Sequence, residues 1–319
     1  MKKLFVFIFA LILLTGGIGR SIALADGEGA AATETPEAAS TSDPDETTRP
    51  MKSTVCLGYN LTEKQKEQVL KYMGLTMSEA EAIGIVYVHI EDEHALLDSY
   101  ISADKIGSRS LSSVYIVMEE EGYGIRVDTH NINWVSPSMY TNALITAGIA
   151  NAKVIVAAPL SVSGTAALAG VYKAYESASG VELSESAKDA ASAELITTGE
   201  LGELFGSEEA AALMAEIKAE VLEKSLTNPD EIRKAIRDIA AAQNISLTDE
   251  QVEQILEVIQ KIAALDIDPQ QFFQQIVRFK QNMDTLQQKN QEALSVVQKI
   301  VQFFIKLGDW LRNLFGKNN

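Results

Sequence analysis

Residues 154–174 read VIVAAPLSVSGTAALAGVYKA, and this stretch decides the fold. Its apolar start, rich in valine and isoleucine, predicts a strand over 153–158 that is buried on both faces. A turn of proline, serine and glycine follows, and an alanine-rich run then predicts a helix that starts near Gly164. A buried strand that leads directly into a helix is the central unit of a sheet with helices packed on it.

The residues before this unit supply the other strands. Weak alternation that ends at Gly58 predicts a short strand over 52–57, and a run of β-branched and aromatic residues predicts a strand over 84–90. The segments 112–118 and 124–131 each alternate between apolar and polar residues, and the turn EEEGYG lies between them. Because two alternating runs joined by a glycine-containing turn are typical of a β-hairpin, we expect these two strands to pair with each other.

Helix start patterns occur between the strands. Thr62 and Gln65 have the spacing of a capping box and predict a helix over 63–73. Ser136 followed by Pro137 predicts another helix, which ends at Gly148. We expect further helices at 92–101, 164–179 and 185–205. The sequence thus predicts an α/β (α+β) mixed-sheet domain over residues 51–206.

After Gly206 only helical patterns remain, so residues 207–319 are predicted to be an all-α helical region. Helices are expected at 207–226, 228–243 and 248–265, and the last one starts at Asp268. That last helix carries an apolar residue every three or four positions, with one polar exception. The seam consists of Phe272, Ile276, Phe279, Met283, Leu286, Asn290, Ala293, Val297, Ile300, Phe304 and Leu307.

Three surfaces could bury this long amphipathic seam. The chain's own helices could cover it, a second copy could pair with it as a coiled coil, or a membrane surface could receive it. Basic residues near its end, Lys299, Lys306, Arg312 and Lys317, suit an anionic membrane. We expect packing on the chain's own helices, with self-association or peripheral membrane contact through 270–317 as the alternatives.

The first fifty residues predict export. Lys2 and Lys3 precede an apolar run over 4–14, and Ala23-Leu24-Ala25 fits a cleavage site, which together indicate a secretory signal peptide over 1–25. Residues 26–50 contain seven acidic residues, three prolines and no large apolar side chain, so we expect a disordered acidic linker. The protein would then be secreted, or held in the cell wall or on the membrane exterior of a Gram-positive-type bacterium.

The chain is strongly acidic. Removing residues 1–25 removes three basic residues and no acid, so the net charge changes from −17 to −20. Such a charge disfavours nucleic acid as a partner. Cys56 is the only cysteine, so no intrachain disulfide can form, and we expect it to be a buried apolar residue.

The turn at 160–165, LSVSGT, is the best candidate for a ligand site. The backbone N–H groups at a helix start can bind an anion, and the hydroxyls of Ser163 and Thr165 could add donors around Gly164. Arg109 could pair with the same small anionic ligand, although pairing with one of the many surface acids is the favoured alternative. The alternative for the turn is a purely structural role, in which Ser163 caps the helix and Gly164 allows the tight turn. The sequence matches none of the known phosphate-loop, dinucleotide or nucleophile-elbow patterns.

The three histidines do not form a metal motif. His89 and His94 are five residues apart, whereas two ligands on one helix face need a spacing of four, and His130 is distant. We therefore expect no metal and no cofactor. Trp134 is expected at the edge of the core.

Region 54–205 resembles the YpuA-like family of exported Gram-positive bacterial proteins, a domain of unknown function (DUF1002). The similar segments are LTEKQKEQVLKYMG, IGSRSLSSVYIVM, NINWVSPSMYTNALITAG, AKVIVAAPLSVSGTAAL and ELITTGELGELFG. The resemblance implies export and a common fold. It supplies no activity, cofactor or catalytic residue.

These observations favour an exported cell-envelope protein that is a non-enzymatic binding module for a small ligand or an unknown envelope protein. The alternative is an envelope hydrolase or transferase whose site lies at the strand, turn and helix of 154–165. That alternative needs a hydroxyl and a base in one pocket, such as Ser163 with His130, or Thr165 with Arg109 nearby. The distance between His130 and Ser163 therefore discriminates between the two.

Overall fold

The computed structural model describes residues 52–268 and 270–283. The expected signal peptide and acidic linker lie outside this range, as does the seam beyond Met283. Among the described residues, no helix combines the length and the apolar composition that a membrane crossing requires.

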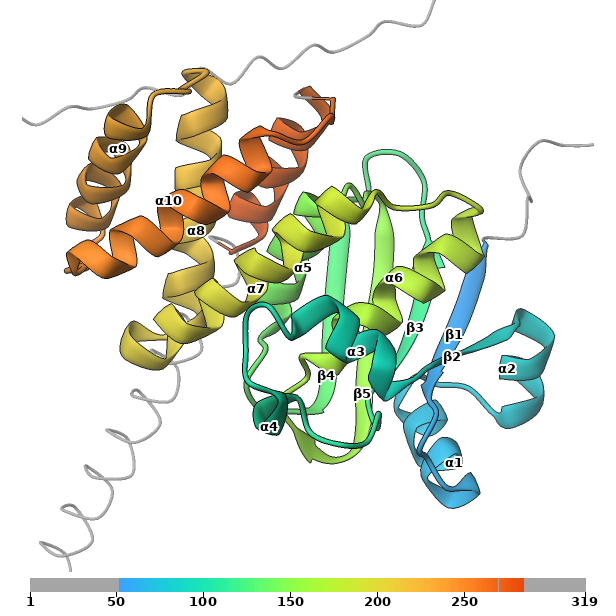
Figure 1. The fold of residues 1–319 in the computed structure, drawn as a ribbon. Coiled ribbons are helices and arrows are strands. Elements are labelled where there is room, and N and C mark those ends of the chain that lie inside the picture. The colour runs from blue at the N-terminus through green and yellow to red at the C-terminus, as the bar shows by residue number, and fades with distance from the viewer. Residues whose placement is uncertain (1–51, 269, 284–319) are drawn as a thin grey trace, which may run out of the picture. The chain divides into compact units, whose positions relative to one another are not determined.

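A five-stranded mixed sheet forms the centre of the α/β layer (Figure 1). Its strands are β1 (Ser53–Gly58), β2 (Ile85–Val88), β3 (Ser113–Met118), β4 (Ile125–Ile132) and β5 (Ala152–Val162). Their order is β2-β1-β3-β5-β4. Pairing is parallel for β1 with β2 and for β4 with β5, and β3 is antiparallel to both of its neighbours. Thus four strands point the same way and only β3 opposes them.

The predicted hairpin is wrong, although both of its strands exist. β3 and β4 are not neighbours, because β5 lies between them and pairs with both. The strand β5 is apolar, so its side chains are buried on both faces of the sheet. Its backbone groups need hydrogen-bond partners along both edges, and β3 and β4 supply them. Alternation and a glycine-containing turn identify the strands, but they do not fix which strands pair.

The strand β5 is also longer than predicted, because it continues through Pro159 to Val162. Its pairing with β3 ends at Ala157, so the proline nitrogen lies where no β3 residue needs a donor. This extension carries the chain past the sheet and places the following turn beside the end of β4, where Ile132 pairs with Val162.

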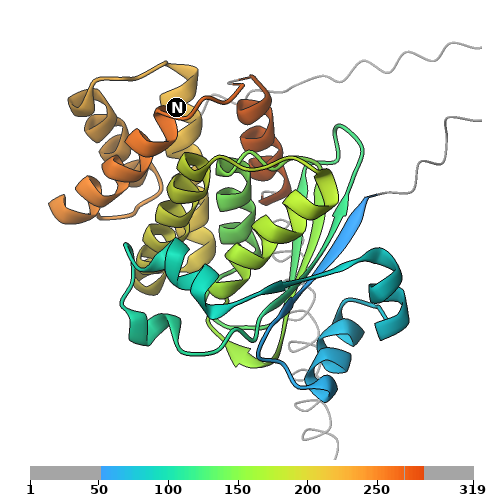
Figure 2. The same ribbon diagram turned by 45° about the vertical axis from the view of Figure 1, so that its right-hand side comes forward.

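Helices cover both faces of the sheet (Figure 2). α1 (Glu63–Tyr72) and α2 (Met77–Ile83) cover one face over a small apolar cluster that includes Val55, Leu57 and Ile155. The predicted capping box of α1 is present, because Thr62 accepts from the Gln65 N–H and Gln65 reaches back to the Thr62 N–H. The short α2 was not predicted.

The other face carries four longer helices and one short one. α6 (Ala166–Ser179) packs directly on the sheet, α3 (Ile90–Leu97) packs on α6, and α5 (Pro137–Thr146) packs under β4. α7 (Glu185–Phe205) lies across α5, and the single turn α4 (Ala103–Ile106) follows α3.

The lone cysteine lies under α6 and is buried, as expected. A Cβ atom added at Gly170 of α6 would lie 3.3 Å from Val114 Cγ2 and 3.6 Å from the Cys56 sulfur, so the helix sits close to the sheet. Burial raises the pKa of Cys56 to about 12, and the thiol is therefore neutral and unreactive at physiological pH.

Beyond α7 the described chain is helical. α8 (Ser207–Glu223), α9 (Pro229–Ala242) and α10 (Asp249–Ala263) are followed by a helix over 270–283. One apolar cluster runs from Cys56 in the sheet to Met283 in this last described helix. The first four seam residues, Phe272, Ile276, Phe279 and Met283, are at most 6% exposed, so this part packs on the chain's own helices.

A buried ion pair joins three helices beneath the sheet. Lys218 of α8 and Glu194 of α7 approach to 2.6 Å, and their side chains are 0% and 1% exposed. The Lys218 ammonium also donates to Thr146 Oγ1 and to the Asn142 carbonyl of α5, each at 3.2 Å. The Thr146 hydroxyl donates in turn to Glu194. Every charge in this cluster is therefore compensated by groups from a neighbouring helix.

Candidate functional site

The turn between β5 and α6 is held by the loop that follows β4. The Asn133 and Val135 N–H groups donate to the carbonyls of Val162 and Ser163, each at 3.0 Å. The hydroxyl of the buried Tyr140 donates to the Gly164 carbonyl. The backbone of the turn is thus fixed on both sides before any ligand arrives.

Gly164 is required by this geometry. Its φ is +94°, a conformation that L side chains rarely adopt. A Cβ atom here would lie 2.4 Å from Ile132 Cγ2 and 2.6 Å from the Tyr140 hydroxyl oxygen. The glycine therefore permits both the turn and the close approach of the β4–α5 segment.

The start of α6 is less open to an anion than the sequence suggests. Thr165 occupies the N-cap position but makes no side-chain capping bond. The N–H groups of Ala167 and Leu168 already donate to the Gly164 and Thr165 carbonyls. The Ser163 and Thr165 hydroxyl oxygens lie 3.2 Å apart and bond to each other. Ser163 is thus no helix cap, and few donors remain for an anion.

A cavity of about 200 Å³ opens at this turn, and we call it the turn cavity. It is lined by Ile101, Trp134, Ser163, Thr165, Glu200 and Glu203. Trp134 forms one wall and donates from its indole nitrogen to Glu203 at 2.7 Å. Its ring rests against α7, since a Cβ atom at Gly199 would lie 2.2 Å from the ring. The tryptophan is half-buried, at the core edge as predicted.

The charge of the turn cavity is negative. Glu200 and Glu203 are its only charged lining residues, and neither forms an ion pair within the described part of the chain. Two carboxylates outweigh the partial positive charge of one helix start. The cavity therefore attracts a cation more readily than an anion.

Of the four predicted site residues, the structure brings Ser163, Gly164 and Thr165 together and leaves Arg109 apart. Arg109 is exposed in the segment between α4 and β3. Its neighbour Ser110 bonds through its carbonyl to Asn60, just after β1, so Arg109 lies two strands away from β5. It is not among the residues that line the turn cavity.

The histidines are dispersed. His130 of β4 stacks on Tyr72 of α1, with ring centroids 5.1 Å apart, and therefore lies on the opposite face of the sheet from α6 and α7. His89 stacks on Tyr59 at 4.1 Å, and His94 pairs with Asp98 at 2.7 Å. In the described chain, no group of three or more His, Cys, Asp or Glu side chains is arranged to hold a metal ion.

One buried carboxyl group was not identified from the sequence. Glu93 of α3 is 0% exposed, and neither of its oxygens has a hydrogen-bond partner among the described residues. Burial raises its pKa to about 7, and the nearby Ser110 hydroxyl opposes the shift. The sequence did contain a hint, because Glu93 is three residues after Ile90 and four before Leu97, on the apolar side of the helix.

Comparison with known proteins places these features in a family. The model of a family described as "Protein of unknown function (DUF1002)" matches residues 57–279. The "Uncharacterized protein YpuA" of Bacillus subtilis (strain 168) is 40% identical over 262 residues, which cover 82% of this chain and 89% of that protein. No solved structure matches.

Replacing Gly164 by valine should destabilise the protein. The new side chain would collide with Ile132 and Tyr140 and would need a strained backbone, so we expect a loss in unfolding free energy of about 3 kcal/mol or more. Ser161→Ala, at an exposed position near the end of β5, should change the unfolding free energy by less than about 0.5 kcal/mol. Denaturant melts of both variants measure this, and equal midpoints would contradict it.

Glu93 should make stability depend on pH. The folded protein keeps its proton up to a pKa of about 7, whereas the ordinary value is 4.5. The stability that protonated Glu93 contributes is therefore fully present below pH 4.5 and is lost as the pH rises to about 7. The unfolding free energy should fall by about 3 kcal/mol over this range. Glu93→Gln should remove this fall, and Glu91→Gln, at an exposed position, should retain it. Melts from pH 4 to 8 test this, and parallel profiles for wild type and Glu93→Gln would refute it.

Proposed function

Because this chain belongs to the DUF1002 family of proteins of unknown function, we propose its function from its own site. It is an exported, non-enzymatic binding module of the cell envelope, and it holds a small ligand in the turn cavity. The observation that carries this proposal is the rigid β5–α6 turn, whose hydroxyls face an aromatic wall and two carboxylates. Binding sites of this kind are concave, mostly apolar and formed in advance, with few polar groups.

The charge of the turn cavity supports a ligand that carries a positive group. An ammonium group could lie between Glu200 and Glu203 and contact Trp134, and both interactions favour a cation. The Ser163 and Thr165 hydroxyls can accept a hydrogen bond from the same group. This differs from the anion that the turn alone led us to expect, because the two carboxylates come from α7, far along the sequence.

The hydrolase or transferase alternative needs a base beside a hydroxyl. His130 does not supply one, because it stacks on Tyr72 on the far face of the sheet while Ser163 faces the turn cavity. Ser163 bonds to Thr165 instead. The geometry thus favours binding over nucleophilic catalysis.

Trp134 provides a direct readout of binding. In full-length mature protein carrying Trp310→Phe, Trp134 is the remaining tryptophan. Tetramethylammonium should change its emission saturably at constant ionic strength, and sodium phosphate should not. Glu203→Gln, which can still accept from the indole, should weaken the response about threefold or more.

Glu182→Gln, at an exposed position that does not line the cavity, is the matched control and should behave like wild type. A saturable response to phosphate with none to tetramethylammonium would refute a cation-binding cavity. Absence of any saturable response would refute the turn cavity as the binding site.

Export is the second part of the proposal. The basic start, apolar run and Ala23-Leu24-Ala25 site support cleavage after Ala25, so the mature protein should begin at Asp26. N-terminal sequencing of protein from the wall or culture fraction measures this. Recovery of the chain with residues 1–25 attached would contradict cleavage.

A further inference from the structure

The outer side of β4 has no strand partner in the described chain, because β4 stands last in the sheet order. The Ala152 N–H donates to the Gly124 carbonyl, so the even-numbered residues at the start of β4 direct their backbone groups towards β5. The N–H and carbonyl groups of Ile125, Val127 and Thr129 therefore point towards the open edge. Such an edge is a template for another strand.

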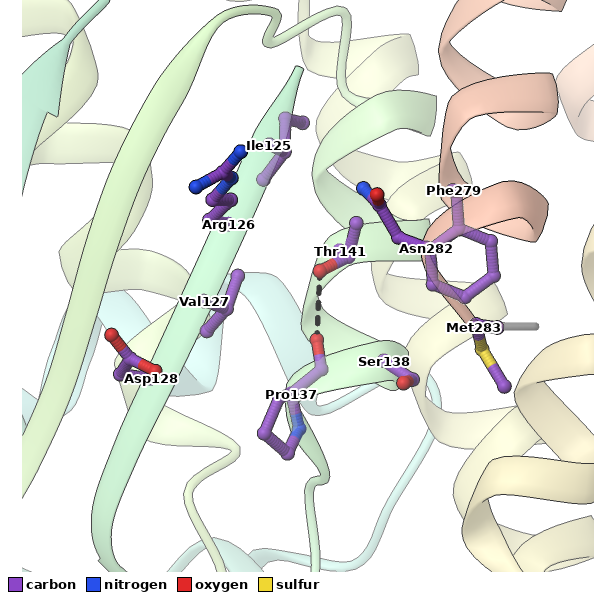
Figure 3. A pocket seen from close by; sticks show the side chains of 10 residues that line it. All are labelled: Ile125, Arg126, Val127, Asp128, Pro137, Ser138, Thr141, Phe279, Asn282 and Met283. Carbon is purple, nitrogen blue, oxygen red and sulfur yellow. Dashed lines mark hydrogen bonds between the residues drawn. The ribbon is translucent and has the colours of Figure 1, made fainter. Parts of the chain in front are cut away.

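A groove of about 410 Å³ runs along this edge, and we call it the β4 groove (Figure 3). It is bounded by β4, by the start of α5 and by the helix over 270–283. The α5 and C-terminal walls are formed by Pro137, Ser138, Thr141, Phe279, Asn282 and Met283. Phe279 and Met283 line that wall but are at most 6% exposed, and the half-buried Val127 and the exposed Pro137 add apolar surface, so a strand laid beside β4 would have an apolar support.

The side chains of β4 alternate along the groove. Ile125 and Val127 point towards α5, whereas Arg126 and Asp128 point to the other side (Figure 3). Arg126 and Asp128 are exposed, and neither has an ion-pair partner among the described residues. The edge therefore presents one positive and one negative charge, two residues apart, on the same face.

We propose that the β4 groove binds an extended segment of a partner protein, which adds to the sheet as an antiparallel strand. The segment carries an acidic residue opposite Arg126 and a basic residue opposite Asp128. Its alternate apolar side chains face Phe279 and Met283. Main-chain hydrogen bonds hold the strand, and the alternate side chains select it.

The shape of the groove favours a single strand over a second copy of this protein. α5 packs beneath β4, so a second copy would bring its own α5 with its β4. The helix over 270–283 is the opposite wall of the groove and stands in the way of such a helix. A segment without a helix behind it avoids this conflict.

The sequence of β4 itself provides a peptide probe, Gly-Ile-Arg-Val-Asp-Thr-His, from residues 124–130. Antiparallel pairing with Val127 opposite Val127 places the peptide's Asp beside Arg126 and its Arg beside Asp128. In this register the outward backbone groups of Ile125, Val127 and Thr129 all find partners, about six hydrogen bonds in total. We expect saturable binding of the fluorescein-labelled peptide to the full mature protein, measured by anisotropy.

Exchanging the charges tests the register. The double variant Arg126→Asp with Asp128→Arg should bind this peptide about tenfold more weakly, because both pairs become repulsive. A peptide with Arg and Asp exchanged should restore binding to that variant and lose it with wild type. This rescue cannot arise from a folding defect, and equal melting points of the two proteins would confirm that.

Val127→Pro tests the backbone bonds. It removes the N–H that points to the open edge, and the bonds to β5 are made by the neighbouring residues. Peptide binding should be lost, and the circular dichroism spectrum should be retained. Peptide binding that is unchanged by both the charge exchange and Val127→Pro would overturn the proposal. So would binding that appears only after residues 284–319 are removed, or a wild-type dimer that excludes the peptide.

Discussion

The contact between Lys218 and Glu194 constrains the whole arrangement beneath the sheet. Removing two charges from water is costly, and the cost is offset only when geometry and additional hydrogen bonds are good. Burial lowers the pKa of Lys218, and the carboxylate opposes that shift. Asn142 and Thr146 of α5 supply the additional bonds, and the Phe272 ring lies 5.9 Å from the ammonium. α5, α7 and α8 must therefore keep their mutual positions, with Phe272 beside the lysine.

The two proposed binding surfaces on this framework differ in the groups that they offer to a ligand. The turn cavity uses side chains, because α7 brings Glu200 and Glu203 to a turn whose backbone is already bonded. The β4 groove uses the backbone, since its strand ends the sheet and its outward groups have no partner in the described chain. α5 lies between them and packs against both β4 and α7. One framework thus presents a small, mostly apolar pocket with two carboxylates and a long open strand edge.

Local sequence patterns predicted most helices and strands because capping, turn residues and apolar periodicity act over a few residues. Thr62 and Gln65 form the expected capping box, and the β5–α6 unit exists where its composition placed it. Strand partners could not be predicted, since the competition that seats β5 between β3 and β4 involves residues far apart in sequence. Only part of the candidate site could be predicted, because its residues come from two distant parts of the sequence. Ser163, Gly164 and Thr165 are adjacent, but Glu200 and Glu203 reach them only through the fold.

The continuous core has a consequence for the order of folding. The apolar cluster joins Cys56, near the start of the described chain, to Met283, at its end. A polypeptide that emerges amino end first from a ribosome or a translocation channel can form α1 and its capping box early, because those contacts are local. The five-stranded sheet cannot form until β5 is available. The Lys218 ammonium gains its contact with the Phe272 ring only when residue 272 is also available. Completion of the native core is therefore a late event, because the apolar cluster needs residues from both ends of the described chain.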